Sequence, residues 1–135
     1  MLKILTVGVY DYFHLGHLRL FKQCKEYADY LIVAVQESEV VKKFKPAAKM
    51  VYSTEERMFM VESLKYVDEV IPYRNVDDIV KSVEFDVFAK GPDQNHEGFQ
   101  RAINWALTNG KSVVTIPRTE GVSSTILRNY LKDND

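Results

Sequence analysis

Residues 3–17 read Lys-Ile-Leu-Thr-Val-Gly-Val-Tyr-Asp-Tyr-Phe-His-Leu-Gly-His, and this stretch decides the fold. Its first part, residues 3–9, is the apolar run of a buried β-strand. Residues 15–27 then place apolar side chains at the spacing of an amphipathic helix. The stretch therefore predicts a strand that passes directly into a helix, the unit from which α/β folds are built.

Two histidines, His14 and His17, lie three residues apart in the turn between this strand and this helix. Side chains at that spacing share one face of a helix, and the free N–H groups of a first turn favour an anion. Gly8 would let the backbone approach a ligand, and Gly16 keeps the helix start free of a side chain. Each imidazole can donate an N–H to a phosphate oxygen, as substitution at phosphorus requires.

Two other interpretations of the histidines stay open at this point. One histidine could cap the helix while the other is solvated. The pair could also bind a metal, but the chain holds only one further histidine, His96, and a single cysteine. A structural zinc site is therefore not expected.

The composition bounds the class of protein. The 135 residues are 46% hydrophobic and 27% charged with a net charge of −1, which indicates one globular domain. A nucleic-acid binder would be more basic, so no nucleic-acid partner is expected. We also expect no membrane span, no signal peptide and a cytoplasmic location. The lone Cys24 is expected to be a small buried hydrophobic residue.

Strand-like and helix-like segments alternate along the whole chain. The apolar strand-like runs are residues 3–9, 30–35, 68–71, 86–89 and 112–116. The helix-like patterns are residues 15–27, 53–66, 77–83, 99–108 and 124–131. Nearly all-apolar strands between helices predict a parallel sheet covered on both faces. The expected fold is a single-domain, Rossmann-like, three-layer α/β fold with five parallel strands.

Two segments do not fit as regular elements. Residues 37–52 form a long lysine-rich connection, and residues 91–98 read Gly-Pro-Asp-Gln-Asn-His-Glu-Gly. Long loops in compact domains are commonly functional. Because Gly91 follows the fourth strand, this loop should lie at the carboxyl ends of the strands, where binding crevices form.

A second polar cluster follows the fifth strand and reads Arg118-Thr119-Glu120-Gly121-Val122-Ser123-Ser124-Thr125. Gly121 allows a tight turn, and the hydroxyls after it can cap the final helix. The same hydroxyls and backbone N–H groups could bind the terminal phosphates of a nucleotide, with Arg118 neutralising their charge. A plain helix cap is the alternative.

Together, the His-x-Gly-His turn and the residue 118–125 stretch resemble the paired signatures of the cytidylyltransferase family, within the HIGH-type nucleotidyltransferase superfamily. The resemblance is strongest to bacterial glycerol-3-phosphate cytidylyltransferases and extends over residues 29–35, 66–72 and 85–88. It implies one nucleotidyltransferase domain over residues 1–135 that transfers a cytidylyl group from CTP to a phosphorylated small molecule and releases pyrophosphate. Glycerol 3-phosphate is the first candidate acceptor, Mg²⁺ the implied cofactor and a homodimer the implied assembly.

The resemblance also assigns roles to residues. The implied catalytic groups are His14, His17, Lys45 (or the nearby Lys42, Lys43 or Lys49) and Arg118. Nucleotide binding is assigned to Gly8, Val9, Tyr10, Gly16, Gly91, Asp93, Gln94, Arg118, Thr119, Gly121, Val122, Ser123, Ser124 and Thr125. Acceptor binding is assigned to Asp11, Lys45, Arg57 and Lys65. No metal site made of protein side chains is predicted.

Some positions depart from the family pattern. Gly91-Pro92-Asp93-Gln94 stands where the family usually has Gly-Asp-Asp-Trp, Val9 replaces a hydroxyl-bearing residue, and Lys65 replaces an arginine. Lysine keeps the charge but not the bidentate fork. Cytidylyl transfer to glycerol 3-phosphate therefore stands beside three alternatives: transfer to a different phosphorylated acceptor for surface polysaccharide synthesis, adenylyl transfer from ATP, and a non-catalytic nucleotide-binding module.

Overall fold

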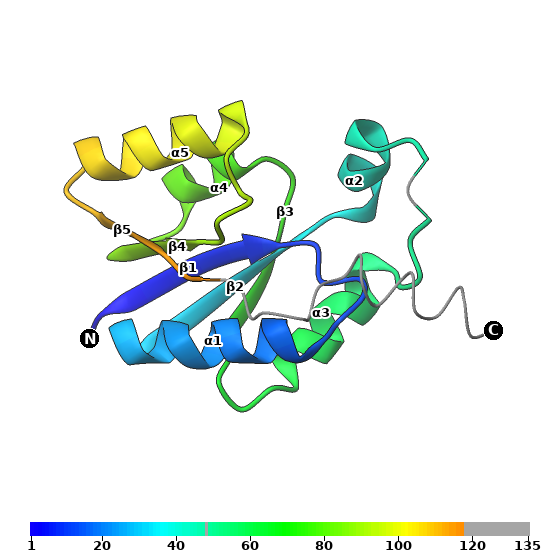
Figure 1. Ribbon diagram of the computed structural model, residues 1–135, viewed down its shortest axis with the longest axis horizontal. Coiled ribbons are helices and arrows are strands. Elements are labelled where there is room, and N and C mark those ends of the chain that lie inside the picture. The colour runs from blue at the N-terminus through cyan, green and yellow to red at the C-terminus, as the bar shows by residue number, and fades with distance from the viewer. Residues whose placement is uncertain (48, 118–135) are drawn as a thin grey trace.

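A computed structural model describes residues 1–47 and 49–117 of the chain (Figure 1). Five parallel strands form one sheet in the order β3-β2-β1-β4-β5. Their bounds are Lys3–Gly8 for β1, Tyr30–Gln36 for β2, Glu69–Tyr73 for β3, Val87–Lys90 for β4 and Ser112–Thr115 for β5. The predicted α/β fold with a five-stranded parallel sheet is confirmed.

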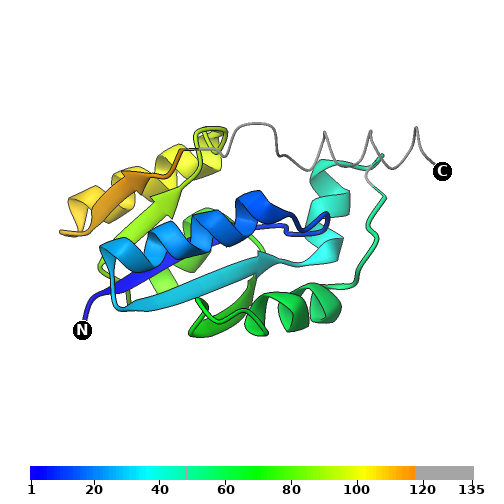
Figure 2. The same ribbon diagram turned by 60° about the horizontal axis from the view of Figure 1, so that its bottom comes forward.

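Helices cover both faces of this sheet, as Figures 1 and 2 show. Helices α1 (Leu15–Tyr27) and α3 (Thr54–Glu62) lie on one face, and α4 (Val76–Ser82) and α5 (Glu97–Thr108) lie on the other. The short helix α2 (Ser38–Phe44) follows β2 directly and lies beyond the carboxyl end of the sheet. The result is the expected three-layer arrangement with one helix at the edge.

The strands are apolar throughout because each one buries both of its faces. In β1, Ile4 joins the core beneath α1 and α3, whereas Leu5 and Val7 join the core beneath α4 and α5. Leu5 pairs in register with Ile32 of β2 and with Phe88 of β4, and all three belong to the second core.

The helix boundaries differ most from the predictions at two places, while α4 and α5 begin one and two residues earlier than predicted. Residues 37–52, expected to be irregular, contain α2, whose Val40 and Val41 are buried. Helix α3 ends at Glu62, before the predicted residue 66, although Leu64 and Tyr66 still pack against the core. The apolar pattern of the sequence extends beyond the helix because Leu64 and Tyr66 pack against the core without being helical. The helix predicted at 124–131 lies outside the described residues.

Two further predictions concern single features of the chain. Cys24 is fully buried on the inner side of α1, as expected, and burial raises the pKa of its thiol to about 12. Within residues 1–47 and 49–117, the helices are too short or too polar to cross a membrane.

The strand order places a topological switch point beside β1. The chain runs from β1 through β2 to β3 on one side and then adds β4 and β5 on the other. Loops that leave β1 and β4 therefore part in opposite directions and open a crevice at the carboxyl ends of the strands, where α/β proteins bind ligands. The histidine turn and the loop after Gly91 both begin there.

Phe88 in β4 tests the core beneath α4 and α5. Its ring is fully buried, with ring centroids 6.3 Å from Phe85 and 6.2 Å from Phe99. We expect Phe88→Ala to lower the free energy of unfolding by about 3–5 kcal/mol, measured by urea denaturation, because it leaves a cavity. Leu107→Ala on the exposed side of α5 is the control, and a loss below about 1 kcal/mol for Phe88→Ala would contradict this packing.

Candidate active site at the carboxyl edge of the sheet

The two histidines of the turn after β1 cap helix α1 reciprocally. His14 is the N-cap residue, and its Nδ1 accepts the N–H of Gly16 at 3.0 Å. His17 is the third residue of the helix, and its Nδ1 accepts the N–H of His14 at 3.2 Å. This is a capping box built from two imidazoles in place of the usual hydroxyl and carboxylate. The spacing of three residues follows from this geometry.

The cap decides which nitrogen of each ring carries the proton. A neutral imidazole has one N–H donor and one acceptor nitrogen. Since both Nδ1 atoms act as acceptors, the protons of His14 and His17 lie on their Nε2 atoms. The rings stack with centroids 4.0 Å apart. The pair thus places two Nε2–H donors at the positive end of a 13-residue helix.

His17 is held in the neutral form. Burial of the ring, together with a smaller effect of the neighbouring His14, lowers the pKa of His17 to about 3. The edge of the Tyr10 ring and the face of the Phe13 ring surround it, with centroids 5.2 Å and 5.1 Å away. At neutral pH His17 is therefore a hydrogen-bond donor without a positive charge.

The position of the Tyr10 ring explains why residue 8 is a glycine. Tyr10 adopts a left-handed backbone conformation with φ of 59°, and its buried ring folds back over Gly8. A Cβ atom at Gly8 would lie 2.6 Å from Cζ of Tyr10. The Tyr10 ring thus fills the side-chain position at Gly8, while the backbone of Gly8 still borders the cavity described next. The Tyr10 side chain supports His17 from inside the protein.

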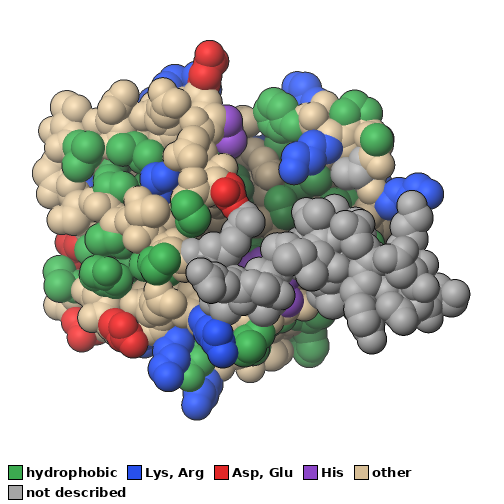
Figure 3. Space-filling view, viewed as in Figure 1, with side chains coloured by type: hydrophobic (Ala, Val, Ile, Leu, Met, Phe, Trp, Pro, Cys, Tyr) green, Lys and Arg blue, Asp and Glu red, His purple; other side chains and the backbone are tan. Residues whose placement is uncertain are grey.

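A cavity of about 640 Å³ opens beside this turn, at the switch point. Figure 3 shows the surface hollowed between α5 and α2, with histidine side chains at its margin. Four of the predicted site residues line the cavity: Gly8, Val9, Lys45 and Gln94. His14 and His17 lie on the adjoining turn, outside the lining.

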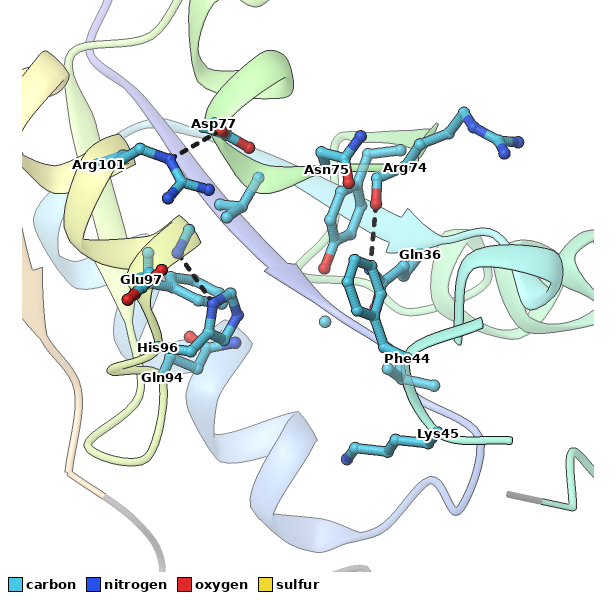
Figure 4. Close-up of a pocket in the computed structure, with 16 residues that line it drawn as sticks. Gln36, Phe44, Lys45, Arg74, Asn75, Asp77, Gln94, His96, Glu97 and Arg101 are labelled. Atoms are coloured by element: carbon cyan, nitrogen blue, oxygen red, sulfur yellow. Dashed lines mark hydrogen bonds and ion pairs between the residues drawn. The ribbon is translucent and has the colours of Figure 1, made fainter. Parts of the chain in front are cut away.

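Most of the polar lining was not predicted from the sequence. These polar residues lie at the end of β2 or in the segments that come after β3 and β4 in the chain. They are Gln36, Arg74, Asn75, Asp77, His96, Glu97 and Arg101. In Figure 4 the guanidinium group of Arg101 points into the cavity, whereas the Arg74 side chain points away from it. The rule that parallel strands bind ligands at their carboxyl ends would have pointed to these positions, because each follows a predicted strand.

Gln94 stands where the family pattern has tryptophan, and it joins the two sides of the switch point. Its Nε2 donates to the carbonyl oxygen of Val7 in β1 at 2.9 Å. Its Oε1 accepts the N–H of Gly91 at 2.9 Å. The loop after β4 is thereby hydrogen-bonded to the central strand, with Asp93 exposed at its tip.

Lys45 is the predicted phosphate-binding residue that the structure places best. It is the C-cap residue of α2, and its ammonium group extends across the cavity mouth toward the side that holds Gln94 and His96 (Figure 4). Lys42 and Lys43 are exposed in the last turn of the same helix. Lys49 follows in the exposed connection to α3.

Two predicted acceptor-binding residues are instead engaged by the protein itself. Arg57 is 0% exposed and donates hydrogen bonds to three carbonyl oxygens and two hydroxyl groups. Asp11 is 7% exposed, and its two carboxylate oxygens accept backbone N–H groups. Burial lowers the pKa of Arg57, while the charge of Asp11 acts in the opposite direction. Neither side chain offers a free face to an acceptor.

Lys65 is remote from the cavity within a single chain. It precedes β3, whose amino end lies at the opposite edge of the sheet, and its ammonium group is 5.1 Å from the centre of the Tyr66 ring. The arrangement of one chain thus gives no support to acceptor binding by Lys65. The predicted residues from Arg118 to Thr125 lie outside the described part of the structure.

The described residues contain no group of three or more histidine, cysteine, aspartate or glutamate side chains that could hold a metal ion. Magnesium is usually bound through substrate phosphates and one or two carboxylates rather than by a protein cage.

The neutral state of His17 makes stability depend on pH. A histidine in the unfolded chain has a pKa near 6.5, so below that pH the unfolded state takes up a proton that folded His17 refuses until about pH 3. We expect the free energy of unfolding to fall as the pH drops from 7 to 4, and to fall less steeply in His17→Asn, which keeps an acceptor near the position of Nδ1.

Urea denaturation at intervals of one pH unit measures both slopes. His96→Asn is the matched control, because His96 caps α5 through the same atom at 3.1 Å but is exposed. Equal slopes for the wild type and His17→Asn would refute the burial of a neutral His17.

Comparison with known proteins identifies the family of this chain. A family model described as Cytidylyltransferase-like matches residues 5–130. The glycerol-3-phosphate cytidylyltransferase of Staphylococcus aureus is 37% identical over 139 residues, which span 100% of this chain and 98% of that protein. An FAD synthase of Thermococcus sibiricus is 37% identical over 99 residues, which span 71% of this chain and 66% of that protein.

A solved structure matches the fold. The lipopolysaccharide core biosynthesis protein of Thermoplasma volcanium superimposes with a TM-score of 0.72 over 88% of this chain and 97% of that chain, at 23% identity. That likeness bears on the fold alone. The family model and the relatives of similar length confirm the resemblance found in the sequence: the chain belongs to the Cytidylyltransferase-like family of nucleotidyltransferases.

Proposed function

We propose that this protein transfers a cytidylyl group from CTP to the phosphate of a small acceptor and releases pyrophosphate. The observation that carries the proposal is the reciprocal cap, which uses both Nδ1 atoms as acceptors and so keeps the Nε2–H groups of His14 and His17 as donors at the start of α1, in the turn after β1. Family membership and relatives named glycerol-3-phosphate cytidylyltransferase give the reaction type.

In the proposed reaction an oxygen of the acceptor phosphate attacks the α-phosphorus of CTP in line. A new P–O bond forms, the bond to the bridging oxygen between the α- and β-phosphates breaks, and pyrophosphate leaves with that electron pair. His14 and His17 would donate to the oxygens of the α-phosphate as their charge grows. Donors fixed before the reaction stabilise a transition state without a cost of reorganisation.

Lys45 would bind phosphate groups from the opposite side of the cavity mouth, because its flexible side chain starts at the end of α2 and extends across the opening. Mg²⁺ would accompany the triphosphate and share its charge. Arg118, Ser123, Ser124 and Thr125 remain the proposed ligands of the β- and γ-phosphates. The homodimer and the cytoplasmic location remain predictions.

Glycerol 3-phosphate is the first acceptor to test, on the strength of the relatives. The cavity of about 640 Å³ also has room for a larger phosphorylated molecule, within the usual range for ligand sites. Gln94 and Pro92 replace the family's usual tryptophan and aspartate at its edge. A different phosphorylated acceptor, such as one used for surface polysaccharide, is therefore kept in the proposal.

Adenylyl transfer from ATP is the second candidate. It is favoured by the similarity to FAD synthases, one of which is 37% identical over 99 residues. Calorimetric titration with CTP and with ATP separates the two candidates, because the nucleotide that donates its nucleotidyl group should bind more tightly.

The first prediction concerns the histidines. Asparagine can replace the Nδ1 acceptor of the cap but not the Nε2–H donor, so His14→Asn and His17→Asn should each lower kcat by about 10²–10³. Glutamine places an amide N–H near Nε2, so His17→Gln should keep more activity than His17→Asn. Pyrophosphate release measures both. Turnover of His17→Asn within threefold of wild type would rule out the donor role.

The second prediction concerns the substrate. Pyrophosphate should be released from CTP only when Mg²⁺ and a phosphorylated acceptor are both present, and EDTA should abolish release. The acceptors to compare are glycerol 3-phosphate, phosphocholine, phosphoethanolamine, sugar phosphates, phosphorylated amino-acid derivatives and FMN. Release from ATP with FMN, and none from CTP with any acceptor, would replace the first candidate by the second.

A further inference from the structure

We infer that Arg57 and Asp11 are positioning residues, which hold the histidine turn and the lysine-bearing segment 45–53 in fixed relation to one another. Both residues are held too firmly by the protein to serve as acceptor ligands. The inference rests on the proposed function for its effect on turnover, while its structural half can be tested without any substrate.

Arg57 joins four segments through every N–H group of its guanidinium. Nη1 donates to the carbonyl oxygens of Val9 and Gln36, both at 2.8 Å. Nη2 donates to Oγ of Ser38 at 2.7 Å and to Oγ1 of Thr54 at 3.3 Å. Nε donates to the carbonyl oxygen of Tyr52 at 3.3 Å. The turn after β1, the end of β2 and the starts of α2 and α3 thus meet at one side chain.

Asp11 holds the far end of the lysine-bearing segment. Its Oδ2 accepts the N–H of Val51 and its Oδ1 accepts the N–H of Tyr52, both at 2.9 Å. Asp11 lies three residues before His14, so these bonds tie the segment directly to the histidine turn. The start of α2 is tied to the start of α3 as well, since Oγ1 of Thr54 accepts the N–H of Ser38 at 3.0 Å.

These contacts leave a substrate phosphate little to bind. Arg57 is fully buried, and a phosphate would have to displace five hydrogen bonds to reach its donors. The ion pairs found among the described residues do not include Arg57, so its charge is met by carbonyl and hydroxyl oxygens. Lysine has no planar fork and cannot make this set of bonds.

Arg57 and Asp11 affect the proposed reaction through the distance between Lys45 and the two histidines. Lys45 begins the segment that Arg57 and Asp11 hold, and the histidines follow Val9 and Asp11 in the turn. If these anchors are lost, the phosphate-binding groups on the two sides of the cavity can move apart. A misplacement of about 1 Å can cost on the order of 10²-fold in rate.

The experiment compares Arg57→Lys and Asp11→Asn with Arg19→Lys, a matched control at an exposed arginine on α1. The first measurement is hydrogen–deuterium exchange of peptides covering residues 45–53. We expect exchange in this segment to be at least tenfold faster in Arg57→Lys and Asp11→Asn than in the wild type and Arg19→Lys. Exchange at the wild-type rate in both variants would overturn the inference, whatever the enzyme's substrate is.

The second measurement separates positioning from ligand binding. A positioning role predicts that Arg57→Lys lowers kcat by about tenfold or more while KM for the acceptor stays within about twofold. It also predicts that Arg57→Lys is no more active than Arg57→Gln. A raised KM for the acceptor alone, with partial rescue by lysine, would overturn it in favour of an acceptor ligand. An inactive wild type would refute the proposed function and leave the exchange result to decide the anchoring.

Ser38→Ala keeps the test decisive if Arg57→Lys does not fold. This variant removes the hydroxyl that accepts from Arg57 at 2.7 Å but leaves all charged groups in place. We expect faster exchange in residues 45–53 and a threefold or greater loss of kcat. Wild-type exchange and wild-type kcat in Ser38→Ala would count against the inference.

Discussion

The pairing of β1 with a parallel neighbour on each side is the constraint on which the rest of this structure depends. β2 and β4 bond to opposite edges of β1, so all three strands end at the same edge of the sheet. The chain segments that follow them cannot continue in the sheet and must separate there. The histidine turn, the lysine-bearing segment and the loop after Gly91 are thereby gathered from distant parts of the sequence.

At the start of α1, one pair of side chains serves both structure and proposed chemistry. The Nδ1 atoms of His14 and His17 satisfy backbone N–H groups that a helix would otherwise leave unpaired. That use fixes the protons on Nε2, where they can meet a ligand. Burial against Tyr10 and Phe13 keeps His17 neutral. The alternatives of a capping histidine and a phosphate-binding histidine are therefore compatible, because they use different atoms of the same ring.

Buried polar side chains organise the other segments around this turn. Arg57 and Asp11 anchor the connection between α2 and α3, and Gln94 bonds the loop after β4 to β1. A buried polar group left unpaired is costly, so each of these side chains specifies one arrangement of the backbone around it. The cavity lies between segments held in this way.

The sheet and the first helix could be predicted from the sequence alone. Apolar runs bounded by turns predicted the five parallel strands, and residues 15–27 were predicted with the bounds that α1 has. Periodicity reports burial, however, and not hydrogen bonding. It therefore extended α3 past Glu62 and missed α2, whose seven residues bury only Val40 and Val41. The contacts of each charged side chain could be read only from the tertiary structure. Arg57 and Asp11 turned inward and Lys65 lay at the wrong edge, because the partners of a side chain come from segments that local sequence does not specify.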